Sequence, residues 1–249
     1  MKRVTLVAAA NLLLIAACLL VGPGCSNDSA TGPDEMGLLS SSQSVVGDID
    51  FTDGYPWGVW QDDFEPYEVG FFPPTWIADG NVSNSYVDGS ISYDGSQSLR
   101  LYGTPYGTWA GCAYKVLDVS PPFEIKVAVY NGSEDIGGKY PARGLIGLLA
   151  GTNWIDPERT LLYFHNSGDI MVANSEVLGT YNSEQWYHIR IRYERPSETE
   201  VKLRYWINNQ CVGSQLVEAS QDEDDFTHLE LLSLEGSAWF DNVEICSRP

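Results

Sequence analysis

Positive charge is scarce in this chain. Its 249 residues include 14 Lys and Arg against 34 Asp and Glu, which gives a formal net charge of −20. Proteins that bind nucleic acid use clustered Lys and Arg to neutralise phosphates, so this balance excludes a nucleic-acid partner. The excess of carboxylates keeps an exported protein soluble and favours divalent cations as companions.

Several enzyme motifs are absent as well. The chain has three histidines and contains no His-Glu-x-x-His zinc helix, nucleophile elbow or phosphate-binding glycine loop. The acidic run from Asp48 to Gly54 lacks the ligand spacing of an EF-hand. Helical periodicity is not sustained anywhere, and no internal repeat recurs at a fixed period, so solenoids and propellers are excluded.

Cysteine is also sparse beyond the N-terminal region. Only Cys112, Cys211 and Cys246 follow residue 25. An exported chain permits disulfides, but three cysteines leave one odd. One bridge with a free thiol and three buried thiols remain equally open, because spacing does not determine pairing.

The N-terminal region predicts export and lipid anchoring. Residues 1–25 combine a short basic start with an apolar run that is too short for a membrane span. Cys18 fits a bacterial lipobox better, whereas Cys25 is better placed at the end of the apolar run, so either is the candidate lipid anchor. The alternative is an ordinary secretory signal in which both cysteines are incidental.

Residues 26–47 are rich in Ser, Asp, Gly and Pro and predict a flexible tether. We expect a membrane-anchored lipoprotein of the cell envelope, with one domain over residues 48–249.

The remaining sequence predicts an all-β fold. Residues 186–193 alternate between apolar and polar side chains, and so do residues 201–207. Period-2 alternation is typical of half-buried antiparallel strands, and the pair Asn208-Asn209 marks a hairpin turn. About a dozen such strands with Gly, Pro, Asn and Asp between them favour a two-sheet sandwich.

The order of these segments resembles the concanavalin A-like lectin/glucanase superfamily, including laminin G-like domains. The resemblance covers about residues 62–245 and rests on Asp63-Phe64-Glu65, on residues 95–101, on Trp186-Tyr187-His188-Ile189 and on Phe240-Asp241-Asn242-Val243. It implies a two-sheet antiparallel jelly roll whose members often bind glycans, with hydrolases and lyases as a subset. These motifs consist of core aromatics and turns, so they indicate fold more than function.

Aromatic residues at turns are the candidate sugar contacts, because a pyranose packs its CH face on a ring. We expect a glycan to bind at Trp57, Trp60, Tyr106, Trp109 and Trp154. Four further tryptophans lie inside strands and are expected in the core: Trp76, Trp186, Trp206 and Trp239.

A structural calcium ion is implied by related sandwiches, which often hold one between their opening and closing strands. Asp63, Glu65, Asp241 and Asn242 would supply its oxygen ligands. Glycosidases of this fold carry a Glu-x-Asp-x-x-Glu run, which is absent here, so no paired-carboxylate catalytic site is predicted.

One face of the ribbon made by residues 186–207 carries a concentration of basic residues, namely His188, Arg190, Arg192, Lys202 and Arg204. Lyases of this fold use His or Tyr with Arg or Gln, so an anionic glycan could lie there. The favoured interpretation is a solvated outer face whose cations pair with Glu194, Glu198 and Glu200 across the strands.

The sequence therefore predicts a surface-tethered module that binds glycans without catalysis. The alternatives are a hydrolase or lyase acting on an extracellular polysaccharide, and an envelope protein that binds another protein.

Overall fold

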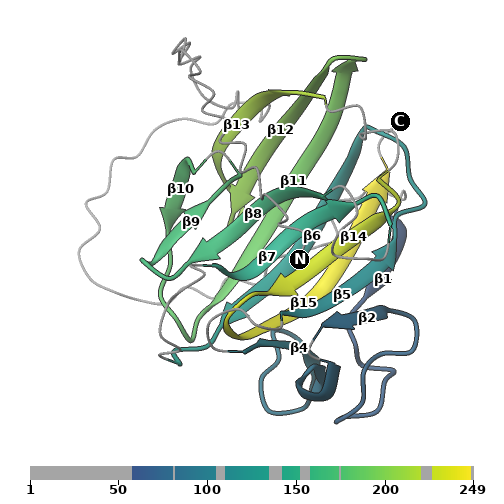
Figure 1. Cartoon of the computed structure of the whole chain (residues 1–249), viewed down its shortest axis with the longest axis vertical. Helices are drawn as coiled ribbons and strands as arrows, with labels where there is room; N and C mark the ends of the chain where they lie inside the picture. Colours follow the sequence, from purple (N-terminus) through teal and green to yellow (C-terminus); the bar gives the residue numbers. More distant parts are fainter. Residues whose placement is uncertain are drawn as a thin grey trace, which may run out of the picture.

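The computed structural model describes residues 58–80, 82–104, 110–134, 142–151, 158–173, 175–219 and 226–247. These residues form fifteen strands and one short 3-10 helix, η1 (Val82–Asn84). The strands build two antiparallel sheets, which lie one over the other in Figure 1. The predicted two-sheet antiparallel sandwich is confirmed. The expectations for residues 1–47, the signal and the tether, lie outside the described residues.

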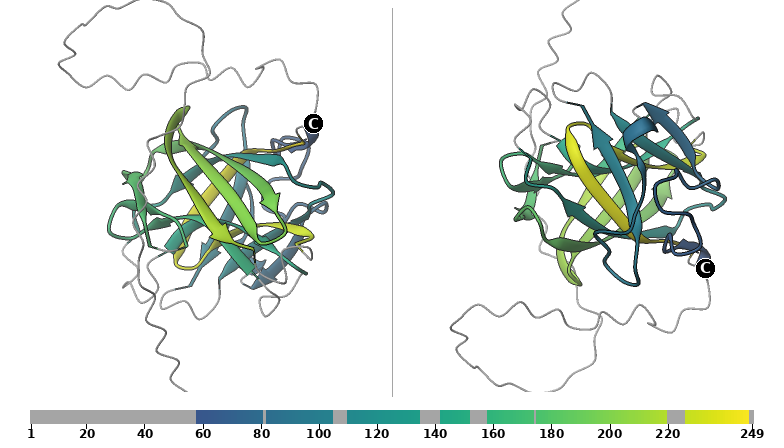
Figure 2. Two further views of the ribbon diagram at one scale, coloured as in Figure 1. Left: turned by 90° about the horizontal axis from the view of Figure 1, so that it is seen from above. Right: turned by 90° about the horizontal axis from the view of Figure 1, so that it is seen from below.

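The first sheet, sheet A, contains eight strands. Its order is β13 (Gln210–Glu218), β12 (Glu200–Ile207), β11 (Trp186–Ser197), β6 (Phe123–Asn131), β15 (Gly236–Ser247), β4 (Ser98–Gly103) and β3 (Tyr86–Asp88), and β1 (Gly58–Asp62) pairs with the C-terminal half of β15. Figure 2 accordingly shows the C-terminal end of the chain beside β1. Opening and closing strands are thus hydrogen-bonded neighbours.

The second sheet, sheet B, contains seven strands. Its order is β10 (Val177–Thr180), β9 (Asp169–Met171), β8 (Glu158–His165), β7 (Ala142–Leu149), β14 (His228–Ser233), β5 (Gly111–Val116) and β2 (Ile77–Gly80). Strands distant in sequence meet in both sheets, so the sandwich depends on long-range pairing.

The core lies between the sheets and follows the predicted alternation. On β11, Ile189 and Ile191 are fully buried, and on β6 the same holds for Ile125 and Val127. Burying one such side chain contributes about 1.5–3 kcal/mol. Between β12 and β13, Asn208-Asn209 forms the predicted turn, with positive φ at both residues as a type I′ turn requires.

The sequence expectation for the four strand tryptophans is correct only in part. Trp76 packs in the core between the sheets at 5% exposure, and Trp239 is buried as well, at 7% exposure, but on the outer face of sheet A. Trp186 and Trp206 lie partly exposed on that outer face. Strand alternation decides this: Tyr187 and Phe240 face the core, so the residue directly before each faces outward. The expectation rested on the position of these tryptophans inside strands, which does not by itself determine the face.

Cys112 and Cys246 are buried and not disulfide-bonded, so the two do not form a bridge with each other. Among the residues that the structure describes, no helix has the length and apolar character needed to cross a bilayer.

Candidate functional site

Five side chains on the outer face of sheet A form one row that crosses five adjacent strands. The strand register places Trp186 opposite Tyr130, Tyr130 opposite Trp239, Trp239 opposite Arg100, and Arg100 opposite Tyr86. We call these five residues the aromatic row. Neighbouring strands are about 4.8 Å apart, so the row is roughly 19 Å long.

The rings of the row contact one another edge to face. Tyr130 lies between two tryptophans, with ring centroids 5.4 Å from Trp186 and 5.4 Å from Trp239. Tyr93, from the loop after β3, adds a further contact at 5.6 Å to Trp186. Such pairs favour tilted and T-shaped geometries. Tyr130, Trp186 and Tyr93 are partly exposed, so a sugar can reach these three rings, whereas Trp239 is buried.

Arg100 introduces a positive charge into the row. Its guanidinium carbon is 5.3 Å from the ring centre of Tyr86, 5.4 Å from that of Tyr102 and 5.6 Å from that of Trp239. Its Nη1 donates to the Tyr86 hydroxyl and its Nη2 to Ser237 Oγ, each at 2.9 Å. Cation–π contacts and neutral hydroxyls therefore hold this guanidinium in place.

Asp88 orients the central indole of the row. Its Oδ2 accepts a hydrogen bond from Trp239 Nε1 at 2.8 Å, and its Oδ1 accepts two from Ser90. Burial acts to raise the pKa of Asp88, but these hydrogen bonds and the charge of Arg100 outweigh it and leave the pKa below its ordinary value. Asp88 is thus ionised at neutral pH.

A loop on the outer face of sheet A is held by two carboxylates. Asp241 Oδ2 accepts the backbone N–H of Tyr93 at 2.8 Å and of Asp94 at 3.3 Å. In the same loop, Glu65 Oε1 accepts hydrogen bonds from the backbone N–H groups of Ser96 and Gln97, at 2.7 and 3.0 Å. These contacts place the Tyr93 ring against the end of the row.

Asp241 is fully buried, and burial raises its pKa to about 7 even though three backbone N–H groups favour the ionised form. The nearby charge of Glu65 acts in the same direction as burial.

The four predicted calcium ligands are only partly brought together. Glu65 and Asp241 hold the same loop, whereas Asp63 is exposed and its Oδ1 accepts the N–H of Glu65. Asn242 is buried beside Asp241. No cluster of three His, Cys, Asp or Glu suited to a metal occurs in the described part of the chain. Calcium binding stays a prediction.

Of the predicted sugar contacts, only Trp60 lies within the described residues. It sits on β1, packs against the core and makes a T-shaped contact with Trp76 at 5.9 Å. The structure does not place it in the aromatic row. Trp57, Tyr106, Trp109 and Trp154 lie outside the described residues.

The basic face predicted from the sequence lies next to the aromatic row, and carboxylates largely neutralise it. Arg190 makes a two-pronged contact with Glu124 at 2.9 and 3.0 Å, and Lys126 contacts Glu244 at 3.1 Å. Arg192 pairs with Glu194 at 2.7 Å. The favoured interpretation of paired cations is thereby supported, although Glu124 and Glu244 from β6 and β15 take the places expected for Glu198 and Glu200.

His188 lies between this basic face and the row but is 3% exposed. Burial, with the charges of Lys126 and Arg190, lowers its pKa to about 4. The imidazole is therefore neutral at pH 7, and solvent does not reach it.

The outer face of sheet B has a different character. Cys112, Tyr114, Leu145, Leu149 and Leu232 form a second buried cluster there, against which Ala110, Tyr163 and Leu234 pack. None of these eight residues is cationic. The strand register adds Glu230, which lies opposite Tyr114 and is 2% exposed. Because these rings, the leucines and the carboxylate are largely buried, we do not assign the glycan site to this face.

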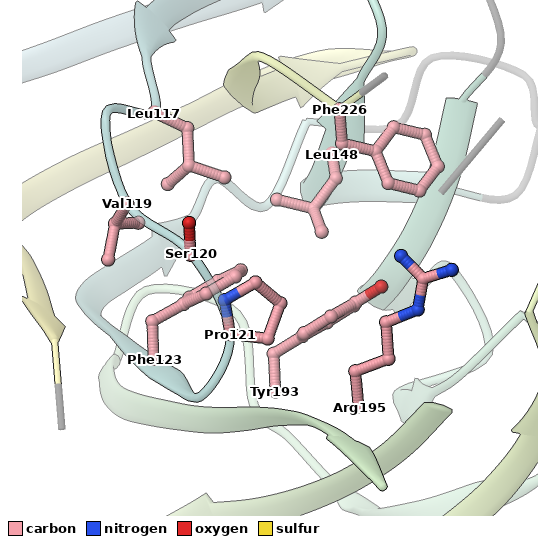
Figure 3. Close-up of a pocket in the computed structure, with 9 residues that line it drawn as sticks. All are labelled: Leu117, Val119, Ser120, Pro121, Phe123, Leu148, Tyr193, Arg195 and Phe226. Atoms are coloured by element: carbon pink, nitrogen blue, oxygen red, sulfur yellow. The ribbon is translucent and has the colours of Figure 1, made fainter. Parts of the chain in front are cut away.

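A small pocket lies at the end of the sandwich remote from the row. Its cavity volume is about 150 Å³. Figure 3 shows Phe123, Pro121 and Tyr193 side by side on one wall, Leu117 and Leu148 across from them, and Arg195 at one edge. Phe123 and Tyr193 are stacked at 4.9 Å. The lining is mainly apolar and the space is too small for an oligosaccharide, so we do not assign the glycan site here.

Sequence reasoning missed the aromatic row. The usable signal was alternation: Trp186 shares its face with His188, and Trp239 shares its face with Asp241, so both belong to the polar side of their strands. That Tyr86 and Arg100 join them could not be predicted, because the pairing of β3, β4, β15, β6 and β11 is a tertiary property.

Comparisons with known proteins give a fold but no family. No family model matches the chain, and no curated protein matches it. Solved structures that it resembles include an endo-β-1,4-glucuronan lyase from the fungus Trichoderma reesei, with a TM-score of 0.57 and 12% identity over 77% of this chain and 96% of the lyase.

Two further structures share the fold. One is a variant of the alginate lyase Aly36B in complex with an alginate tetrasaccharide, with a TM-score of 0.51 and 12% identity over 76% of this chain and 96% of that chain. The other is the cellulose induced protein Cip1, with a TM-score of 0.51 and 14% identity over 76% and 97%. The chain thus has the β-sandwich fold found in polysaccharide lyases.

Proposed function

We propose that this chain is a lyase that acts on a uronate-containing polysaccharide bound along the aromatic row. Trp186 and Tyr130 are partly exposed on adjacent strands, about 5 Å apart, which suits the CH faces of two successive sugars. A guanidinium in the same row suits one carboxylate, which it can bind with two parallel hydrogen bonds. The row thus combines a stacking surface with a charge-specific anchor.

The position of Arg100 carries this proposal. The other arginines and lysines with partners on this face, at positions 126, 190, 192 and 204, each have a carboxylate within 4 Å. Arg100 instead donates to two hydroxyls, those of Tyr86 and Ser237. An incoming carboxylate can replace a hydroxyl partner more easily than it can displace a carboxylate.

The chemistry follows from the pair Arg100 and Tyr86. Arg100 would neutralise the uronate carboxylate and so acidify the proton on the ring carbon that bears it. Tyr86, acting as its phenolate, would accept this proton, and the electron pair would form a double bond to the neighbouring carbon as the bond from that carbon to the glycosidic oxygen breaks. The tyrosine would return a proton to that oxygen, so the elimination balances without water or another reactant.

The comparisons favour an enzyme over the non-catalytic module that the sequence analysis placed first. Two of the resembling structures are lyases of uronate polymers, and one of them holds an oligosaccharide. At 12% identity the likeness concerns the fold, so the roles of Arg100 and Tyr86 rest on the geometry of this chain alone.

We also propose that the protein is exported and anchored through a lipidated Cys18 or Cys25, which would hold it near extracellular polysaccharide. A structural calcium ion near Glu65 and Asp241 is a further proposal. Two carboxylates that hold one loop, one of them fully buried, suit a cation that would offset their mutual repulsion.

The test is the ultraviolet absorbance of the unsaturated uronate that an elimination produces. Purified protein incubated with uronate polysaccharides should generate this product. Tyr86→Phe should abolish product while leaving binding within about twofold, and Arg100→Gln should weaken both. Trp206→Ala is the matched control, because Trp206 lies on the same outer face but stacks on Arg190 at 4.4 Å, away from the row. Binding without product from any uronate polymer would reject the lyase and leave a non-catalytic glycan-binding module.

A further inference from the structure

The two ends of the aromatic row differ in charge. Arg100 lies on β4, near the β3 end of the row, and Asp88 lies on the neighbouring strand β3. At the β11 end no Lys or Arg belongs to the row, and carboxylates lie beside the rings. Arg190 and Lys126 of the neighbouring basic face are already paired with Glu124 and Glu244. This asymmetry bears on which glycan fits the row.

Two glutamates border Tyr130. Glu184 is fixed there by its backbone N–H, which donates to the carbonyl of Asn131 at 2.8 Å, and by its carboxylate, which accepts from Ser133 at 2.6 Å. Burial raises the pKa of the Tyr130 hydroxyl, and the charges of Glu184 and Glu134 raise it further. Both glutamates therefore place negative charge near this ring.

Two aspartates border Tyr93 and, through it, Trp186. Asp94 follows Tyr93 directly and is exposed, and Asp241 holds the backbone of both residues. Asp94 thus adds a carboxylate beside the end of the row that carries Trp186.

Distance separates the two ends electrostatically. Arg100 and Trp186 are three strand spacings apart, or roughly 14 Å. The Debye length at physiological ionic strength is about 8 Å, so the field of Arg100 is largely screened at Trp186. A second carboxylate there would meet Glu184 and Asp94 without compensation.

We infer that the substrate is a heteropolysaccharide in which a single uronate is flanked by neutral sugars, rather than a continuous polyuronate. This inference rests on the proposed function. The uronate binds at Arg100, and neutral sugars stack on Tyr130 and Trp186. Like charges placed against one another reject the wrong partner, so Glu184 and Asp94 are specificity-determining residues.

Binding by the full chain to three soluble polymers tests the inference. The probes are polyglucuronate, in which every sugar is a uronate; hyaluronan, in which uronate alternates with an uncharged sugar; and a neutral β-glucan. We expect hyaluronan to bind at least about tenfold more tightly than polyglucuronate, which corresponds to about 1.4 kcal/mol. The difference should shrink as salt is added, because screening weakens the repulsion.

Variants locate the effect. Glu184→Gln with Asp94→Asn should bring polyglucuronate to within about threefold of hyaluronan, whereas Glu198→Gln, in the exposed turn between β11 and β12, should leave the ratio unchanged. Asp94→Asn alone, at an exposed position, should reduce the ratio of the two affinities by less than the double variant does.

The outcomes separate the inference from the proposed function. Equal or tighter binding of polyglucuronate by the parent protein, lost in Arg100→Gln, would overturn the inference and leave the proposed function standing. Binding of the β-glucan alone, or of no polymer, would reject both.

Discussion

Cys246 lies on the outer face of sheet A, where its thiol donates a hydrogen bond to Oε1 of Glu244 at 2.7 Å. Burial raises the pKa of this thiol to about 12, and the neighbouring carboxylate acts in the same direction. Since the thiolate is the reactive species, this cysteine should be inert in the folded protein.

We expect Cys246 to resist alkylation by iodoacetamide at pH 8 in the native state and to react fully in urea. Mass spectrometry of the peptide that contains it gives the readout. Glu244→Gln removes the negative charge and should make the thiol measurably more reactive. Rapid native labelling in the parent would contradict the described burial.

His188 makes the folded protein sensitive to acid. Its pKa is about 4 in the folded state against an ordinary value of 6.5, so below pH 6.5 the unfolded chain binds the proton more tightly. Stability is therefore full above pH 6.5 and falls as the pH drops toward 4, by about 2–4 kcal/mol if this group acts alone. Asp241 acts in the opposite direction, because its raised pKa makes the folded state the stronger proton binder between about 7 and 4.

The variant His188→Gln should thus lose less stability between pH 6.5 and 4 than the parent, as measured by urea unfolding at each pH. Asp241→Asn should show the reverse, with a larger fall in unfolding free energy than the parent as the pH drops from 6.5 to 4. Parallel curves for His188→Gln and the parent would mean that this imidazole already titrates normally.

At the scale of strands, the contact between β6 and β11 depends on a buried charge pair. The Glu124 side chain is 3% exposed and accepts both hydrogen bonds from Arg190. Removing one partner of such a pair leaves a buried charge uncompensated, whereas replacing both is often close to neutral.

Arg190→Met should therefore cost about 2–4 kcal/mol of unfolding free energy, which is at the lower end for such pairs because Arg190 is itself 25% exposed. The double variant Glu124→Gln with Arg190→Met should recover most of that loss. Denaturant unfolding of the parent, Arg190→Met, Glu124→Gln and the double variant gives the coupling energy. If the losses of the two single variants add up to the loss of the double variant, the pair is not coupled.

Strand alternation could be predicted well at this scale, and strand partners could not. The apolar face of β11 follows from residues 187–193 alone, because successive side chains point to opposite sides. Nothing local states that β6 lies between β11 and β15. The aromatic row exists only because those strands meet in that order. The candidate site could therefore not be predicted from the sequence, because the sequence gives its residues but not their strand neighbours.

At the scale of the whole molecule, the sandwich presents two unlike outer faces. Sheet A carries the row and the paired charges, whereas sheet B carries a buried apolar cluster.

Lipid anchoring through Cys18 or Cys25 predicts that the full-length protein fractionates with membranes when it is produced in a bacterium. Changing both residues to Ser should release it into the soluble fraction, because the acyl chains supply the membrane affinity. Each single change serves as the control and identifies the modified residue. Membrane retention of the double variant would reject the anchor.

Composition and periodicity by themselves determined that this chain is acidic, all-β and a two-sheet sandwich. These properties depend on local alternation, on turn residues and on total charge, all of which can be read directly from the amino-acid sequence. Only the tertiary structure decided that Trp186, Tyr130, Trp239, Arg100 and Tyr86 lie side by side. Residues as distant in sequence as Arg100 and Trp239 meet through hydrogen-bonded strand pairs whose choice depends on the packing of the whole core. The same packing leaves Arg100 among hydroxyls while its neighbours on the sheet are paired with carboxylates.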